Sequence, residues 1–195
     1  MSAKYIRTMR KIDVWQKLSG KPPMNIFYLS QKPSRCARWH CDKHVVKMIL
    51  ETAQLLYTAH WVLSGGKPDF RTAPYRKNTE ERGYMSIKNV KHPSAIWVRE
   101  SLDHYVWLCQ LGIALCWEYN HRFGMKKQHS CELHIHWLYE NLPPTLQSVG
   151  WKEPPRAMPD QHKYVENTIL CYRRYYRDGK KHLLNYTHRH APHWL

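Results

Sequence analysis

Residues 35–63 read RCARWHCDKHVVKMILETAQLLYTAHWVL and contain neither glycine nor proline. A run of this length that stops at Ser64-Gly65-Gly66 predicts one long helix over 35–63. Apolar side chains cover most of its circumference, whereas a helix on a protein surface shows a broad polar face. We therefore expect this helix to lie at the centre of the fold.

The polar side chains of this helix form one narrow stripe. They recur at intervals of three and four residues, which places them on one face, and they are His40, His44, Lys47, Glu51 and Gln54. Ionisable groups on a central helix are costly to bury unless they line a cleft or pair with one another. The stripe indicates a cleft with a chemical function, with a buried structural network or a solvated edge as the alternatives.

A second helix that is apolar on more than one face is expected over 95–123. It follows His92-Pro93-Ser94, since proline is favoured in the first turn, and it ends before Gly124, a residue type that often follows a helix. Two such helices bury their apolar surface by crossing in a shared core. The sequence therefore predicts a mainly α fold, a compact helical domain built on two long core helices.

Three smaller elements complete this prediction. Short helices are expected over 130–141 and 160–178, the second with Asp160 as its N-cap. Residues 25–29 are rich in β-prone side chains and allow one short strand near the start of the core.

The domain is expected over residues 24–195, after a basic N-terminal arm over residues 1–23. Within it, residues 64–93 form a long loop with an excess of basic side chains. Loops of this length inside a compact domain are often functional. We expect a basic binding loop, with a partly disordered insertion as the alternative.

The chain is strongly basic. Its 31 Lys and Arg exceed its 15 Asp and Glu, which gives a net charge of +16, and such a charge attracts polyanions. Residues 172–182 interleave cations with aromatic rings, which suits nucleic acid because rings stack on unpaired bases; a core role for Tyr172 and Tyr176 is the alternative. The expected contacts to nucleic acid, with DNA the favoured partner, are Arg71, Arg76, Lys77, Arg173, Arg177, Lys180 and Lys181.

Several classes of protein are excluded. No apolar run reaches the roughly 20 residues of a membrane helix, and no secretory signal is recognisable. The six cysteines lack a CxxC pair and are expected as buried free thiols. Walker A, GxGxxG and GxSxG motifs are absent, which argues against nucleotide-driven motors, Rossmann oxidoreductases and α/β-hydrolases. We expect an intracellular protein with no membrane partner.

The stripe combines groups with complementary chemistry. A carboxylate such as Glu51 activates water or stabilises an oxocarbenium centre, and a lysine amine such as Lys47 attacks a sugar C1′. Their i,i+4 spacing also suits a plain ion pair. No cofactor is expected, and the alternative is a divalent metal such as zinc held by His40, His44 and Glu51.

Several segments resemble one known family. They are HCDKHVVKMILETAQLL (residues 40–56), HPSAIWVR (residues 92–99), EPPRAMP (residues 153–159) and the tyrosines and arginine of residues 172–176. The chain resembles, over residues 24–195, small proteins of phages and large DNA viruses, some of which are described as pyrimidine dimer DNA glycosylases. The resemblance implies a DNA repair glycosylase, with or without AP-lyase activity, in the cytoplasm or nucleus of a host cell or in the virion.

The phage endonuclease V glycosylases attack with an N-terminal amino group, whereas here 23 residues precede Met24. A glycosylase built on this chain would need an internal lysine, or water activated by Glu51. The catalytic residues expected on this hypothesis are Asp42, His44, Lys47 and Glu51, with His92 and Arg99 near them. The alternatives are a basic nucleic-acid-binding or DNA-packaging protein without turnover, and a metal-dependent nuclease that uses the histidines and a carboxylate.

Overall fold

The computed structural model describes residues 24–124, 128–163 and 166–195, and over these ranges the protein is mainly helical, as predicted. Its α-helices are α2 (Pro33–Trp39), α3 (Asp42–Leu63), α4 (Pro93–Val98), α5 (Leu102–Phe123), α6 (Glu132–Glu140) and α7 (Thr168–Arg174). The shorter turns are the 3₁₀-helices η1 (Ile87–Asn89), η2 (Asp160–His162) and η4 (Lys181–Leu183), and the π-helix η3 (Tyr175–Gly179).

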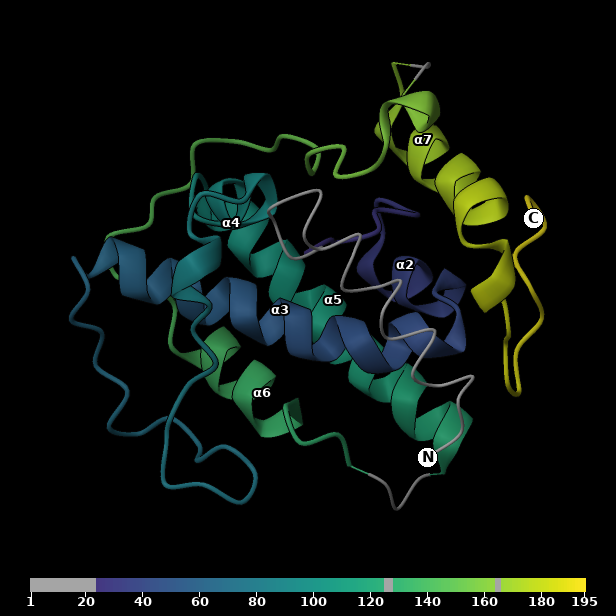
Figure 1. The fold of residues 1–195 in the computed structure, drawn as a ribbon. Coiled ribbons are helices and arrows are strands. Elements are labelled where there is room, and N and C mark those ends of the chain that lie inside the picture. The colour runs from purple at the N-terminus through teal and green to yellow at the C-terminus, as the bar shows by residue number, and fades with distance from the viewer. Residues whose placement is uncertain (1–23, 125–127, 164–165) are drawn as a thin grey trace, which may run out of the picture.

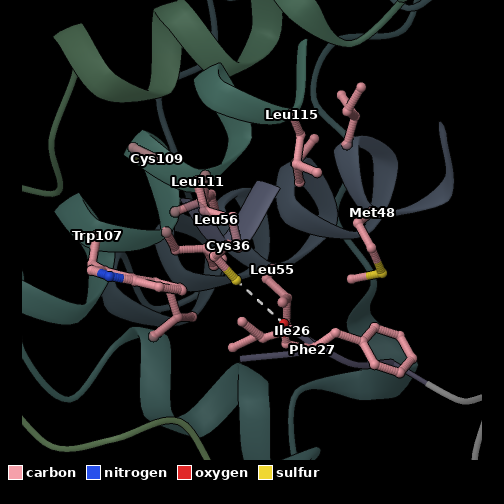
Figure 2. Packing of buried hydrophobic residues seen from close by; sticks show 14 of the residues in the cluster. Ile26, Phe27, Cys36, Met48, Leu55, Leu56, Trp107, Cys109, Leu111 and Leu115 are labelled. Atoms are coloured by element: carbon pink, nitrogen blue, oxygen red, sulfur yellow. Dashed lines mark hydrogen bonds between the residues drawn. The ribbon is translucent and has the colours of Figure 1, made fainter. Parts of the chain in front are cut away.

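Helix α3 is the centre of this arrangement, because α4, α5 and α6 all pack against it (Figure 1). Its apolar side chains, such as Leu55 and Leu56, join Leu111 of α5 in one continuous hydrophobic cluster (Figure 2). The same cluster includes the extended residues 24–29, which are tied to α2 where the Cys36 thiol donates to the Phe27 carbonyl at 3.4 Å. The prediction of two long helices in a shared core is confirmed.

Gly112 lets α5 approach its neighbours closely. A Cβ atom at this position would lie 2.9 Å from the Thr52 methyl group of α3 and 2.9 Å from a methyl group of Ile135 of α6. Ordinary carbon contacts are about 3.5–4.0 Å. The three helices therefore meet at a point where only a hydrogen atom fits.

The two long helices are each interrupted, which corrects the predicted boundaries. The helix expected over 35–63 breaks at His40 and Cys41, whose backbone is extended. The carbonyl of His40 there accepts a hydrogen bond from the buried Arg122 side chain at 2.8 Å, in place of a helical N–H. The helix expected over 95–123 is divided into α4 and α5, because Ser101 caps the start of α5 through the Asp103 N–H.

The smaller elements also differ in part. Helix α6 confirms the helix expected over 130–141, but the segment 160–178 holds η2, α7 and η3, and Asn167 caps α7 where Asp160 was expected to start the helix. Residues 25–29 form neither helix nor strand, so the short strand expected there is not formed. Among the described residues, β-pairing is limited to an isolated bridge between Tyr75 and Arg82.

Other sequence expectations are confirmed. Helix α3 ends before Gly65 and Gly66, and α5 ends before Gly124; all three glycines have positive φ. The six cysteines are buried free thiols. In the part of the chain that the structure describes, no helix combines the length and apolar composition needed to cross a membrane.

Replacing Gly112 with alanine tests the close approach of the helices. Alanine raises helix propensity by about 1 kcal/mol, yet its methyl group overlaps the Thr52 and Ile135 side chains, and overpacking costs about 1–3 kcal/mol. We expect a net loss of stability in urea unfolding, partly restored by adding Thr52→Ser. Gln110→Ala, at an exposed position of the same helix, should be nearly neutral; equal effects of the two substitutions would contradict this packing.

Candidate functional site

Asn25 shapes the extended segment that precedes α2. Its Oδ1 accepts hydrogen bonds from the backbone N–H groups of Ile26 (2.8 Å) and Phe27 (2.9 Å), and its Nδ2 donates to the Ala157 carbonyl (2.6 Å). This turn holds Phe27 at a φ of 50°, a left-handed conformation that is unfavourable for a bulky residue. Such strain costs about 1–3 kcal/mol and tends to collect at functional sites.

Glu51 of α3 is bonded to this segment and is only 6% exposed. Its Oε2 accepts from the Asn25 backbone N–H at 3.1 Å, and its Oε1 lies 2.9 Å from Nζ of Lys47, one helical turn earlier. Burial raises the pKa of the Glu51 carboxyl, although Lys47 and the Asn25 N–H act in the opposite direction. The Lys47 side chain is 51% exposed, so the pair joins a buried acid to an amine that a ligand can reach.

The two histidines of the stripe are buried and neutral at pH 7. Nδ1 of His44 lies 2.5 Å from the Tyr176 hydroxyl, and the His44 ring stacks on Phe27 with 4.2 Å between the centroids. Burial, helped by nearby positive charges, lowers the pKa of His44 from 6.5 to about 2. His40 contacts the Cys36 carbonyl through Nδ1 at 2.7 Å, and burial lowers its pKa to about 4. The stripe is thus a buried network at its histidines and reaches the surface at Lys47.

The π-helix η3 brings further side chains to the same place. It carries Tyr176, which meets His44, and Tyr175, whose ring is stacked at 6.2 Å from that of Phe27. At its end, Nζ of Lys180 lies 4.8 Å from the Tyr175 ring centroid, and the positive charge of Lys180 also acts on Glu51. π-helical turns are frequent at functional sites, and here one lies beside the strained Phe27 turn.

We call this arrangement the Glu51 site; it consists of Asn25, Phe27, His44, Lys47, Glu51, Tyr175, Tyr176 and Lys180. The structure brings together three of the predicted catalytic residues, His44, Lys47 and Glu51, with the predicted phosphate contact Lys180. Sequence reasoning missed Asn25 and Phe27. Their only signal was an asparagine, a turn-forming residue type, at the start of a β-prone run.

Asp42, also predicted as catalytic, belongs to a different network. Its carboxylate accepts hydrogen bonds from Arg122 (3.0 Å), from the side chain of Asn185 (2.6 Å) and from the backbone and hydroxyl of Thr187. Nine residues, about 13 Å of helix, separate Asp42 from Glu51. The structure therefore places Asp42 in a clamp that fixes the C-terminal tail to the start of α3.

His92 and Arg99, expected near the catalytic centre, lie at the two ends of α4. Nδ1 of His92 accepts from the Ser94 N–H at 3.2 Å and so caps the helix, and Nη1 of Arg99 donates to the Ala95 carbonyl at 2.6 Å. These bonds are local to α4, which packs against α3. A contribution of the two residues at the Glu51 site stays a prediction.

The predicted nucleic-acid contacts fall into two separate groups. One lies in the loop between α3 and α4, where Arg71 and Arg76 pair with Asp69 (2.8 Å) and Glu81 (2.6 Å), which cancels much of their charge, and Lys77 is exposed. The other group lies in α7 and in the turns that follow it, on the opposite side of the molecule in Figure 1, and consists of Arg173, Arg177, Lys180 and Lys181. Only the second group is next to the Glu51 site.

The rings of the segment 172–176 divide between core and site. Tyr172 and Tyr176 are fully buried, as the core alternative proposed, whereas Tyr175 is partly exposed. The Tyr172 hydroxyl donates to the Pro155 carbonyl at 2.7 Å and fixes the segment that precedes η2. Tyr175 is thus the tyrosine of this segment that retains exposed surface.

His40 and His44, the two histidines of the predicted stripe, form hydrogen bonds within the protein. Among the described residues, no group of three or more His, Cys, Asp or Glu side chains is placed to hold a metal ion. In the ligand set considered from the sequence, Nδ1 of His40 contacts Cys36, Nδ1 of His44 contacts Tyr176, and both oxygens of Glu51 have partners.

A hollow of about 340 Å³ lies elsewhere, at the C-terminal ends of α3 and α6. His60, Asp69 and Trp137 contribute to its walls. Nε2 of His60 contacts the Tyr105 hydroxyl at 2.8 Å. The Glu51 site is therefore distinct from this hollow, since nine residues of α3 separate Glu51 from His60.

Replacing Glu51 with glutamine should leave the protein at least as stable as before, because a buried negative charge is removed and the Asn25 N–H keeps an acceptor. In the folded protein the pKa of Glu51 is raised above its usual value of 4.5. The free energy of unfolding therefore falls as the pH rises from about 4.5 through the raised pKa. The advantage of Glu51→Gln should grow across that window, by about 1.4 kcal/mol for each unit by which the pKa is raised. Urea unfolding at several pH values measures it.

Asp42→Asn is the matched comparison at another buried acid of α3. It removes a partner of the fully buried Arg122, and breaking such a pair costs about 3–5 kcal/mol. A comparable loss of stability in Glu51→Gln would show that the ion pair between Glu51 and Lys47 stabilises the fold, which would contradict this prediction.

Comparison with known proteins does not assign the chain to a family. No protein-family model, curated protein or solved structure matches it. The Glu51 site and the net charge of +16 are therefore the features that indicate a function.

Proposed function

We propose that the protein is a DNA-processing enzyme, a repair glycosylase with AP-lyase activity, whose reaction depends on Lys47 and Glu51. The observation that best supports this is the 2.9 Å contact between the half-exposed Lys47 amine and the buried Glu51 carboxylate. A lysine is a nucleophile only after its proton has left, and a carboxylate whose pKa is raised by burial is the stronger base. The net charge of +16 favours an anionic polymer as substrate.

The proposed reaction begins with transfer of a proton from Lys47 Nζ to Glu51. The neutral amine forms a bond to C1′ of the deoxyribose while the bond between C1′ and the base breaks. The base leaves with that electron pair and takes the proton back from Glu51. Opening of the sugar ring then moves a proton from the nitrogen to O4′ and gives a protonated imine between Lys47 and C1′. Glu51, ionised again, removes a proton from C2′, and the 3′ phosphate leaves with the C3′–O electron pair, which cuts the strand.

Tyr175 and Lys180 are placed to hold the substrate. Chemistry on a base within a duplex requires that the nucleotide be turned out of the stack. The partly exposed Tyr175 ring offers a surface on which such a base stacks, and the Lys180 ammonium next to it pairs with a neighbouring phosphate. Neutral His44 supports this arrangement by stacking on Phe27 and contacting Tyr176.

A second candidate is a nucleic-acid-binding or DNA-packaging protein without turnover. Its support is that both oxygens of Glu51 already have partners within the chain, as they would in a structural network. On this candidate Lys47 and Lys180 contact phosphates, and Glu51 only orients Lys47. Salt-sensitive binding without any bond cleavage is its expected behaviour.

Borohydride trapping tests the enzymatic proposal. The full chain is incubated with labelled duplexes that carry ultraviolet photoproducts, an abasic site or no damage, with and without EDTA, and any imine is reduced to a stable adduct. We expect an adduct with damaged DNA that Lys47→Ala abolishes, and a rate about 10²–10⁴-fold lower in Glu51→Gln. Lys43→Ala, an exposed lysine one turn earlier on the same face of α3, is the control and should retain the adduct.

The outcomes separate the candidates. An adduct that persists in Lys47→Ala would place the nucleophile elsewhere, and cleavage that EDTA abolishes would favour a metal-dependent nuclease. Binding with no loss of base or strand on any duplex would reject the enzyme and leave the packaging candidate.

A further inference from the structure

Arg173 of α7 is a partly buried cation for which the described residues provide no carboxylate. Its guanidinium lies 4.7 Å from the Trp39 ring centroid and 5.5 Å from that of Trp194. Its Nε donates to the Leu29 carbonyl at 3.1 Å, the one hydrogen bond described for its five N–H groups. The aromatic rings thus fix the position of Arg173, and the N–H groups of its Nη1 and Nη2 atoms have no hydrogen bond described in the structure.

Helix α2 adds more positive charge next to Arg173. Arg35 and Arg38 of α2 are exposed, as is Lys32 at its N-cap, and α2 contains no acidic residue. The guanidinium of Arg35 lies 5.8 Å from the same Trp39 ring. Burial, and next the positive charge of Arg35, lower the pKa of Arg173. In the described ranges none of the three α2 cations forms an ion pair.

We call this surface the α2–α7 basic face; it consists of Lys32, Arg35, Arg38, Trp39, Arg173 and Trp194. Like charges held together without a counter-ion repel one another, and an anion that binds between them relieves that cost. A guanidinium presents paired donors that match the oxygens of a phosphate. The face is therefore built for a phosphate-bearing ligand.

We infer that the α2–α7 basic face binds the phosphate backbone of DNA a few nucleotides from the Glu51 site. The inference rests on the proposed function, and it adds Lys32, Arg35 and Arg38 to Arg173, which the sequence already predicts as a nucleic-acid contact. Arg173 is bonded to Leu29, and Lys180 lies 6.0 Å from the ring of Phe27. Phe27 and Leu29 are two residues apart, so their backbones are separated by at most about 7 Å. A DNA strand advances about 3.4 Å per nucleotide, so one strand reaches both places.

The position of the rings favours DNA over an anionic membrane. Membrane-surface proteins insert apolar side chains below the headgroups. Here Trp39 and Trp194 contact Arg173, and Trp194 also packs at 6.3 Å from the Tyr176 ring, so these rings support the cations instead of projecting from the surface.

The salt dependence of DNA binding tests the inference. Fluorescence anisotropy with a short labelled duplex gives the affinity of the full chain over a range of salt concentrations. Removing one phosphate contact lowers the slope of log affinity against log salt by about 0.9, and we expect that change in Arg35→Gln. Arg35→Lys should restore most of the slope. Lys88→Gln, an exposed lysine of η1, is the charge-matched control and should leave the slope unchanged.

Each outcome decides a separate question. Equal slopes for Arg35→Gln and Lys88→Gln would overturn the inference, as would binding to phosphatidylserine vesicles but not to the duplex. If Arg35→Gln lowers the slope while no borohydride adduct forms on any duplex, the face binds DNA and the enzymatic proposal fails. If the adduct forms and the slope does not change, the enzyme stands and the face is not its DNA contact.

Discussion

The side chain of Arg122, at the end of α5, is fully buried. A buried guanidinium cannot bind water, so the surrounding chain must supply its hydrogen-bond acceptors. Nη1 donates to the His40 carbonyl and the Asp42 carboxylate, Nη2 donates to the Arg38 carbonyl, and Nε donates to Glu118. These acceptors come from the end of α2, the start of α3 and α5 itself. The hydrogen bonds from Arg122 stabilise the interruption between α2 and α3, where the extended backbone leaves the His40 carbonyl without a helical N–H donor.

The same network fixes the C-terminal tail and, through it, the Glu51 site. Glu118 also pairs with Arg189 at 2.8 Å, and Asp42 binds Thr187. The tail is thereby anchored after η4, so the segment that contains η3 is fixed on both sides, with Tyr176 against His44. The strained Phe27 turn is stabilised by Asn25 and by stacking on that histidine. Irregular backbone persists here because packing and hydrogen bonds from several directions offset its cost.

The sequence predicts the features of the fold and of the site that depend on contacts between residues close together in the chain. It does not predict those that depend on distant residues. The central position of α3 and the alignment of His44, Lys47 and Glu51 follow from helical periodicity, which is local, and the residues that end α3 and α5 are glycines. The interruption at His40 is different, since its cause, Arg122, lies 82 residues away. Asp42 binds Arg122, Asn185 and Thr187, which are also distant in the chain, so its place in the clamp was not predictable. Asn25 reaches Glu51 across 26 residues, and no spacing rule connects the two.

Glu51 is a buried acid: burial disfavours its ionised form and raises its pKa, and the nearby charge of Lys47 partly offsets this effect. Titration of the Glu51 carboxyl carbon by NMR, assigned with Glu51→Gln, tests this most directly. The account predicts a pKa above the usual 4.5 that rises further in Lys47→Met, because the lysine charge lowers it, while Lys43→Met changes it little. A pKa at or below 4.5, or one that does not respond to the loss of Lys47, would contradict the claim.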